Sequence, residues 1–266
     1  DNGTVYGSDS LGTNGWFAVG GGDGADLVIN PSDDSNFYIA SQNANIFRTN
    51  DFGSSYTSIR PPIVPGSAIF ITPYEIDPNN HERLFLGADR LWRSDDRGST
   101  WQPSSPATGN TYNDLISALA VAPGNSNQVL YANQSAIIRI NNALDGSNLY
   151  QTTVKRPRQG WVSSLAYDPN DANVAYATYS TFGGNHVWKT TNAGITWLPI
   201  DGDGPGQLPD VPVHKLVVDP NDGDRLYIGT DLGVFVTLDG GQNWAVENTG
   251  FSQVITEDLV IRTTPS

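Results

Sequence analysis

The sequence predicts an all-β protein, a β-propeller built from four-stranded blades with a distinctive turn in each blade. Three observations support this prediction. The 266-residue chain contains many short apolar runs of strand length, the segments between them are rich in Asp, Asn, Gly and Pro, and the pattern recurs about every 46 residues. A period of this length that holds four strand-length runs is typical of a propeller blade.

The first apolar run of each unit ends in a turn that contains proline. These turns contain Pro31, Pro78, Pro123, Pro169 and Pro220. Proline presets φ and the neighbouring Asn or Asp tolerates a left-handed conformation, so each turn is expected to close a hairpin with the run that follows. We therefore expect antiparallel pairing within each unit, and no helix longer than two turns. The expected inner strands include residues 27–29, 119–121, 165–167 and 216–218.

A third run in each unit leads into the pattern S/T-x-D-x-G-x-x-W. It is complete at residues 94–101 and 237–244, it has one change at 49–56 and one at 190–197, and a degenerate copy lies near 140–144. Asp can accept backbone N–H groups, Gly supplies a φ that a Cβ resists, and an indole can fill the gap between sheets. We expect these residues to be structural: Asp51, Gly53, Tyr56, Asp96, Gly98, Trp101, Asn192, Gly194, Trp197, Asp239, Gly241 and Trp244.

These segments resemble Asp-box (BNR-like) repeats, which occur in bacterial sialidases, sortilin-like domains, xyloglucan-cleaving glycoside hydrolases and many secreted β-propellers. The resemblance spans roughly residues 5 to 262. It implies the propeller fold, with the boxes on the outer turns of the blades. It also implies that any binding or catalytic chemistry lies elsewhere, in the loops around the central axis.

The whole chain is expected to form one propeller or a propeller fragment. The repeat units are about 25–70, 71–116, 117–161, 162–212 and 213–253, with half units at 1–24 and 254–266. In the C-terminal half unit, residues 258–262 match an innermost strand. If the two half units share one blade, the propeller has six blades and no exposed sheet edge. The alternative is that the chain belongs to a larger propeller. Its opening without an initiator Met suggests a mature product or a piece of a longer protein.

The composition excludes several classes of function. Asp and Glu number 28 against 14 Lys and Arg, a net charge of −14 that repels nucleic acids and anionic membranes. No apolar run approaches the roughly 20 residues needed to cross a bilayer. The absence of Cys excludes disulfides and thiolate metal sites. Acidity and abundant Asn, Ser, Thr and Gly favour a secreted or cell-surface location.

The candidate ligand-binding residues lie in loops that lead into the inner strands. Two of these loops, 60–73 and 201–214, are stiffened by proline. Aromatic rings can stack on sugar faces and carboxylates can serve glycoside hydrolysis, although acidic residues also populate any surface loop of this chain. The nominated residues are Asp23, Asp26, Tyr112, Asp114, Trp161, Asp210, His214 and Asp258.

The expected function is binding or scaffolding within a larger secreted or surface protein, with a glycan or protein ligand on the axial face and other domains of the parent chain as partners. The alternatives are a xyloglucanase-like glycoside hydrolase that uses axial carboxylates and a sortilin-like peptide receptor. Sialidase activity is disfavoured because Arg48, Arg93 and Arg139 recur just before the boxes and so are expected to be architectural. No cofactor is expected. Ca²⁺ near Asp23 and Asp26 is an alternative without a specific motif.

Overall fold

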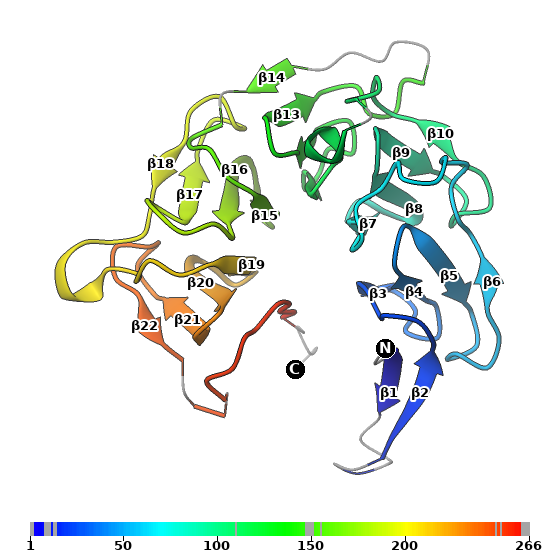
Figure 1. The fold of residues 1–266 in the computed structure, drawn as a ribbon, viewed down its shortest axis with the longest axis horizontal. Coiled ribbons are helices and arrows are strands. Elements are labelled where there is room, and N and C mark those ends of the chain that lie inside the picture. The colour runs from blue at the N-terminus through cyan, green and yellow to red at the C-terminus, as the bar shows by residue number, and fades with distance from the viewer. Residues whose placement is uncertain are drawn as a thin grey trace. The chain divides into compact units, whose positions relative to one another are not determined.

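The computed structural model describes residues 3–7, 12, 15–109, 111–146, 152–154, 156–247, 249–250 and 252–261 (Figure 1). These residues form five four-stranded antiparallel sheets and one two-stranded sheet. The helices in the described part are single 3₁₀ turns, η2 (Tyr112–Asp114) and η3 (Gly204–Gly206). The prediction of an all-β fold without a long helix is confirmed.

The chain divides into two compact units, residues 1–116 with 144–149 and residues 117–143 with 150–266. Each unit is described separately. Unit 1 holds a two-stranded sheet and two four-stranded sheets. Its strands are β1 (Thr4–Gly7), β2 (Trp16–Gly20), β3 (Leu27–Ile29), β4 (Phe37–Ser41), β5 (Asn45–Thr49), β6 (Thr57–Ser58), β7 (Tyr74–Asp77), β8 (Asn80–Gly87), β9 (Leu91–Ser94) and β10 (Gln102–Pro103).

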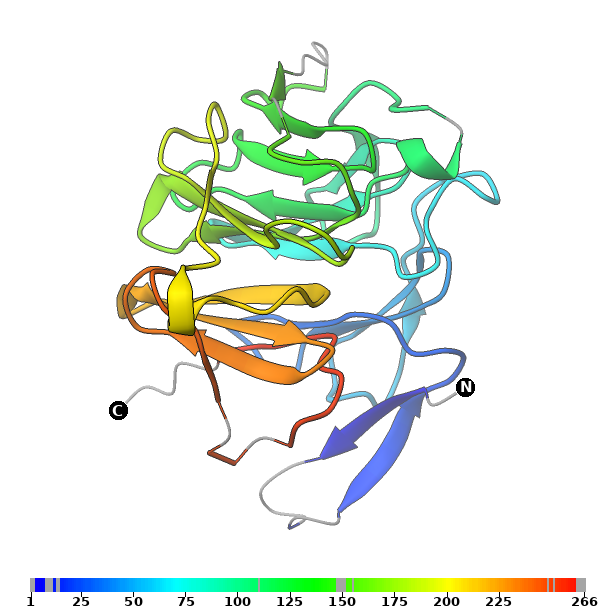
Figure 2. The same cartoon turned by 60° about the vertical axis from the view of Figure 1, so that its left-hand side comes forward.

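Unit 2 holds three consecutive four-stranded sheets, each a simple meander in chain order. Figure 2 shows two of them, β15–β18 and β19–β22, packed face to face. The strands of unit 2 are β11 (Ala118–Val121), β12 (Val129–Ala132), β13 (Ile137–Ile140), β14 (Thr152–Val154), β15 (Val162–Asp168), β16 (Asp171–Tyr179), β17 (Val187–Thr190), β18 (Leu198–Pro199), β19 (Val213–Asp219), β20 (Asp222–Thr230), β21 (Gly233–Thr237) and β22 (Ala245–Val246).

The predicted inner strands are present and pair as expected. Strands β3, β11, β15 and β19 each pair antiparallel with the strand that follows the proline turn. In the third of these pairs Leu165 lies opposite Ala177. Side chains of a strand alternate between the two faces of its sheet. With this register, the apolar side chains of β15 and β16 lie on faces that pack against neighbouring sheets.

The hydrophobic core is distributed between neighbouring sheets rather than gathered at one centre. In unit 1 one cluster joins residues of sheets β3–β6 and β7–β10, including the fully buried Tyr38 and Leu86. In unit 2 one cluster joins sheets β11–β14 and β15–β18, and another joins β15–β18 and β19–β22. A sheet buries an apolar face only where a neighbouring sheet covers that face. The hydrophobic core therefore lies in the contacts between successive repeats.

Serine hydroxyls join successive inner strands of unit 2. Ser117 Oγ donates to the carbonyl of Val162 at 2.8 Å, and Ser163 Oγ donates to the carbonyl of Val213 at 2.5 Å. Tyr74 has a comparable role in unit 1, where its hydroxyl donates to the carbonyl of Asp26 at 2.7 Å. These bonds fix the loops that enter the inner strands, which are the loops nominated for binding.

The C-terminal segment differs from the expected inner strand. Residues 258–261, the described part of the predicted 258–262 strand, have no strand conformation. Leu259 and Ile261 instead help to line a hollow of about 250 Å³ with side chains from β19, β20 and β21, while Val260 is 80% exposed. Strand formation also needs hydrogen bonds to a partner strand, and no strand in the described ranges pairs with this segment. None of the helices in the described ranges is long and apolar enough to cross a membrane.

Candidate functional site

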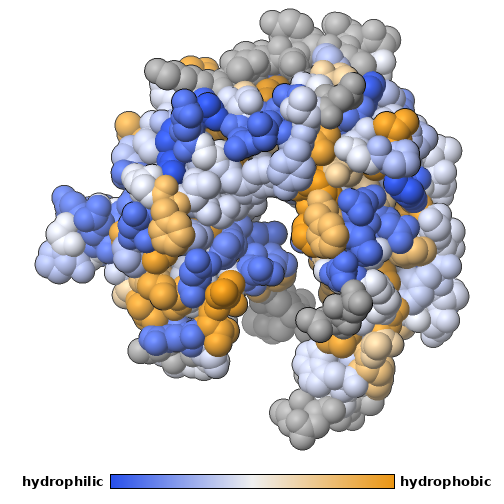
Figure 3. All heavy atoms as spheres, in the orientation of Figure 1, coloured by the Kyte–Doolittle hydropathy of each residue, from blue (hydrophilic) through white to orange (hydrophobic). Residues whose placement is uncertain are grey.

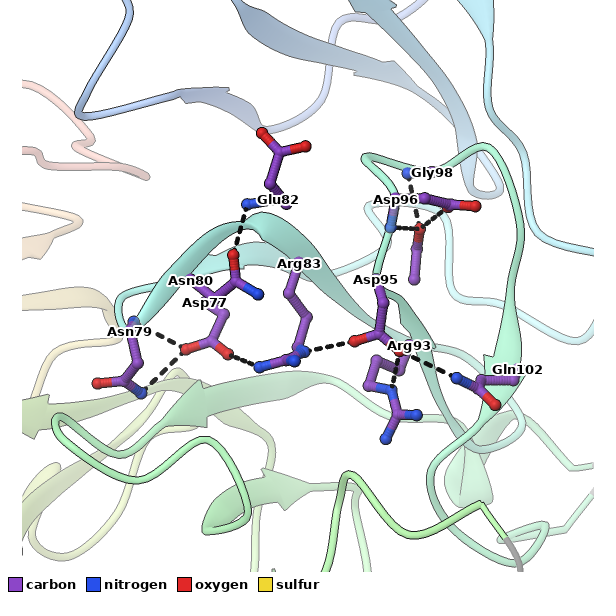
Figure 4. Close-up of polar contacts among 11 residues, drawn as sticks. Asp77, Asn79, Asn80, Glu82, Arg83, Arg93, Asp95, Asp96, Gly98 and Gln102 are labelled. Atoms are coloured by element: carbon purple, nitrogen blue, oxygen red, sulfur yellow. Dashed lines mark hydrogen bonds and ion pairs between the residues drawn. The ribbon is translucent and has the colours of Figure 1, made fainter.

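The predicted turn segments 49–56, 94–101, 190–197 and 237–244, called the box turns below, share one hydrogen-bond pattern. In the second turn, Asp96 Oδ1 accepts the Thr100 N–H at 2.8 Å and the Ser94 hydroxyl at 2.8 Å. Ser94 Oγ accepts the Gly98 N–H at 2.7 Å (Figure 4). The carboxylate and the hydroxyl therefore satisfy the N–H groups that the turn frees.

The backbone of the box turns explains the glycine at their fifth position. That residue has a φ of +83° at Gly53, +85° at Gly98, +88° at Gly194 and +95° at Gly241. A Cβ at Gly98 would also come within 2.6 Å of the Ile59 side chain. Glycine is needed here for both conformation and space.

The aromatic residues of the box turns lie between neighbouring sheets. Trp244 is 6% exposed and its indole Nε1 donates to the carbonyl of Ile200 at 2.7 Å. Trp101 is partly buried and makes the corresponding bond to Ile59, also at 2.7 Å. Trp197 is 9% exposed and packs in the cluster that joins sheets β11–β14 and β15–β18. These contacts give the box turns a structural role in each sheet-to-sheet contact.

Two of the arginines nominated as architectural support the next box turn along the chain. Arg48 Nη1 donates to the carbonyl of Arg97 at 2.8 Å in unit 1, and Arg139 Nη1 donates to the carbonyl of Ala193 at 2.9 Å in unit 2. Both acceptors directly follow the Asp or Asn of a box turn. Arg93 instead pairs with Asp95 at 2.9 Å within its own sheet (Figure 4).

In unit 1, the nominated residues do not form one cluster of free carboxylates. The Asp23 N–H donates to Gln42 Oε1 at 3.3 Å, and the Asp26 carbonyl accepts the Tyr74 hydroxyl. Asp114 is occupied by its own turn, because its carboxylate accepts the N–H and the hydroxyl of Thr111. Tyr112 is 60% exposed in the same turn.

A pocket of about 390 Å³ in unit 1 lies beside the Asp23 loop. One wall comes from the β4–β5 turn and the other from the proline-rich loop between β6 and β7. Its lining combines amide side chains, one guanidinium and aliphatic groups, and includes no Asp or Glu. The lining residues are Gln42, Asn43, Asn45, Arg60, Ile63, Val64, Pro65, Gly66 and Ala68.

The β4–β5 turn at this pocket has a strained backbone. Asn43 and Ala44 have φ of +60° and +57°, although neither is glycine. Ala44 is fully buried, and the Asn43 N–H donates to the Phe70 carbonyl at 2.9 Å, which holds the turn against the long loop. The same conformation occurs in box turns at Phe52, Arg97 and Ala193, so at a non-glycine residue it marks a backbone that surrounding contacts enforce. The sequence analysis missed these residues, although it identified the stiff loop 60–73 that forms the opposite wall.

In unit 2, the nominated residues form three separate pairs. His186 Nε2 contacts Asp210 Oδ1 at 2.8 Å, His214 Nε2 contacts Asp231 Oδ1 at 2.7 Å, and Lys215 pairs with Asp258 at 2.9 Å. Trp161 is partly buried, and its carbonyl accepts the Ser180 N–H. His186 and Asp201 were not among the nominated residues, because their partners lie on loops distant in sequence.

Asp210 and Asp201 have pKa shifts in opposite directions, and both carboxylates accept hydrogen bonds from backbone N–H groups. Hydrogen bonds from the Gly183 N–H and from His186 hold the pKa of Asp210 below its usual value. Burial raises the pKa of Asp201, but its two oxygens accept the N–H groups of His186 and Val187 at 2.7 and 3.0 Å. Asp201 therefore positions backbone. Over the described residues, no group of three or more His, Asp or Glu side chains is placed to hold a metal ion.

Comparisons with known proteins identify similar propellers. No family model matches the chain. A xyloglucanase of Paenibacillus sp. is 24% identical over 230 residues, which cover 78% of this chain and 18% of that protein. The crystal structure of the GH74 xyloglucanase from Xanthomonas campestris superposes with a TM-score of 0.71 at 20% identity, and covers 92% of this chain and 42% of that one.

Two further solved structures support the same fold. The GH74 enzyme of Niastella koreensis gives a TM-score of 0.65 at 20% identity, over 84% of this chain and 38% of that one. YCF48 bound to D1 peptide gives 0.54 at 15% identity, over 81% of this chain and 65% of that one. The fold is a β-propeller. The chain spans less than half the length of each xyloglucanase or GH74 protein named here.

Proposed function

We propose that this chain is a non-catalytic propeller of a larger secreted or cell-surface protein, and that it binds a neutral β-glucan of the xyloglucan kind in the 390 Å³ pocket of unit 1. That pocket is the observation that carries the proposal. The similarity to a xyloglucanase supports the substrate class. The four box turns, which have the pattern of Asp-box repeats, support a place among the secreted propellers that contain such repeats.

The chemistry of the pocket suits a neutral sugar. Amide groups of Gln42, Asn43 and Asn45 can both donate to and accept from hydroxyl groups. Arg60 adds donors, and Ile63 and other aliphatic groups offer a surface for C–H faces. A volume of about 390 Å³ lies within the usual range of small-molecule pockets. Since the lining includes no carboxylate, the pocket supports binding without cleavage.

Glycoside hydrolysis is the second candidate function, and the xyloglucanase similarity favours it. It needs two carboxyl groups, roughly 5 to 9.5 Å apart, that flank the scissile bond. The nominated carboxylates Asp114, Asp210 and Asp258 already have other partners. These partners count against Asp114, Asp210 and Asp258 as the cleaving pair.

Affinity gel electrophoresis tests the proposal. The purified chain should be retarded in gels that contain xyloglucan, and should migrate normally with the anionic polymer polygalacturonate. Asn43→Gly removes the side-chain amide, and glycine suits the φ of +60° at this position. The affinity measured from the retardation should therefore fall about fivefold, without loss of stability. Asn50→Gly, a change at an exposed Asn in the first box turn, is the matched control.

A reducing-sugar assay on the same samples separates the two candidates. Binding without release of reducing ends supports the proposed function, and release would replace it with hydrolysis. Equal retardation of Asn43→Gly, Asn50→Gly and the unchanged chain would show that the pocket is not the binding site.

A further inference from the structure

We propose that Phe182 in unit 2 is a second, preorganised sugar-binding platform, on which a pyranose ring of a glucan of the same class stacks. This inference rests on the proposed function, and extends it to a site outside the 390 Å³ pocket. Phe182 lies in the loop between β16 and β17, and its side chain is 66% exposed. The loop continues through Gly183 and Gly184, whose φ values of +83° and +86° suit glycine.

A single guanidinium fixes the loop from one side. Arg158 Nη1 donates to the Asn185 carbonyl at 2.9 Å, and its Nη2 donates to the carbonyls of Thr181 and Phe182, both at 3.2 Å. The guanidinium carbon also lies 5.2 Å from the centre of the Tyr179 ring. Because the Arg fork is planar and rigid, three carbonyls are held in one fixed arrangement.

Carboxylates from another loop fix the loop from a second side. Asp210 Oδ1 accepts the Gly183 N–H at 2.8 Å and also contacts His186 Nε2 at 2.8 Å. His186 is 1% exposed, and its Nδ1 faces the Tyr179 carbonyl at 3.2 Å. Asp201 accepts the His186 N–H at 2.7 Å. The backbone on both sides of Phe182 is thus held by charged groups.

This arrangement exposes an aromatic ring on a backbone that is already ordered. A ligand that stacks on Phe182 does not have to order the loop, so less conformational entropy is lost on binding. The C–H groups on a pyranose face carry partial positive charge, which complements the negative face of a phenyl ring. Arg158 and Asp210 are engaged with loop groups, which favours a neutral ligand over an ionic one.

The surroundings of Phe182 favour a sugar over a protein partner. Its loop neighbours are Thr181, Gly183, Gly184 and Asn185, which are small or polar. A protein interface of useful affinity needs a contiguous, desolvated apolar centre around its anchor residue. Figure 3 shows one face of the molecule, on which hydrophobic residues gather in a few patches between hydrophilic ones.

Isothermal titration calorimetry with xyloglucan oligosaccharides tests the inference on the full chain. Phe182→Ala should weaken binding at this second site about tenfold, which is the range of an aromatic contact, and should leave the affinity of the unit 1 pocket unchanged. Phe182→Tyr should bind as the unchanged chain does. Leu198→Ala is the matched control, because Leu198 is 71% exposed on β18 of the same sheet. Melting temperatures should agree for all of these variants, since each changes an exposed side chain.

Asp210→Ala tests the preorganised loop separately. Loss of the carboxylate should speed hydrogen exchange at the Gly183 amide and weaken binding about threefold, with Phe182 still present. If Asn43→Gly weakens binding and Phe182→Ala does not, the inference is wrong and the proposed function stands. If the unchanged chain binds no xyloglucan oligosaccharide, the proposed function fails and the inference fails with it.

Discussion

Replacement of Arg83 by Ala should destabilise unit 1 strongly, because it would leave a buried carboxylate without its cation. Arg83 Nη1 lies 2.8 Å from Asp77 Oδ2, and its Nε lies 2.5 Å from Asp95 Oδ1 (Figure 4). The Asp77 side chain is 0% exposed and would keep only the hydrogen bonds from the Asn79 main chain and amide. Breaking a buried pair from one side costs about 3 kcal/mol or more, so we expect a loss of about 3 kcal/mol.

Arg225 provides a matched control at the equivalent point of a later repeat. Arg225 Nη1 lies 3.1 Å from Asp219 Oδ2, and it also pairs with Asp222. Here the arginine side chain is 40% exposed and the Asp219 side chain is 14% exposed. Water can therefore replace much of the interaction, and Arg225→Ala should cost no more than about 1 kcal/mol.

Urea unfolding at pH 7, followed by far-ultraviolet circular dichroism, measures both losses. The double variant Asp77→Asn with Arg83→Ala should recover part of the loss, because it removes the uncompensated charge as well as its partner. Equal losses for Arg83→Ala and Arg225→Ala would refute the argument from burial. A double variant as unstable as the sum of its single changes would refute the argument from the buried charge.

Four further substitutions test the box turns. Trp244→Phe removes the donor to the Ile200 carbonyl and should cost about 1 to 2 kcal/mol in urea unfolding, and an unchanged midpoint would contradict this. Gly240 and Ala193 occupy the same position of two box turns, and their φ values of +70° and +54° both favour glycine. Gly240→Ala should therefore lower the free energy of unfolding by about 1 kcal/mol, whereas Ala193→Gly should raise it by about 0.5 kcal/mol. Hydrogen bonds within its turn lower the pKa of Asp239 from 3.8 to about 2, so its contribution to stability is present above about pH 4 and is lost as the pH falls to 2. Acid unfolding of Asp239→Asn should lose this pH dependence, and an identical acid profile would count against it.

The elements of the fold were predictable because they depend on local chemistry repeated along the chain. Proline turns such as Asp168–Asn170 close hairpins through nearest-neighbour geometry, and the register of β15 with β16 follows from the turn. The box turns are local for the same reason, since Asp96 bonds to groups within four residues of itself. The C-terminal strand was predicted wrongly in the described range 258–261, because strand formation depends on a partner edge as well as on an apolar run.

The candidate sites were less predictable, because each joins segments that are distant in sequence. The nominated Asp23 lies beside the unit 1 pocket, but Asn43 and Arg60 line it, and neither belongs to a motif. Nothing in the sequence around Ala44 predicts that its backbone is left-handed.

By itself, the sequence determined the repeat, the turns and the alternation of strands, because each depends on interactions within about ten residues. Tertiary structure decided which polar groups have partners. Asp210 was nominated as a ligand-binding carboxylate, but packing of the loops places it against Gly183 and His186, 27 and 24 residues away. The same packing leaves Phe182 exposed on a fixed backbone. Contacts over such separations depend on how whole sheets and loops pack, and no local pattern specifies that packing.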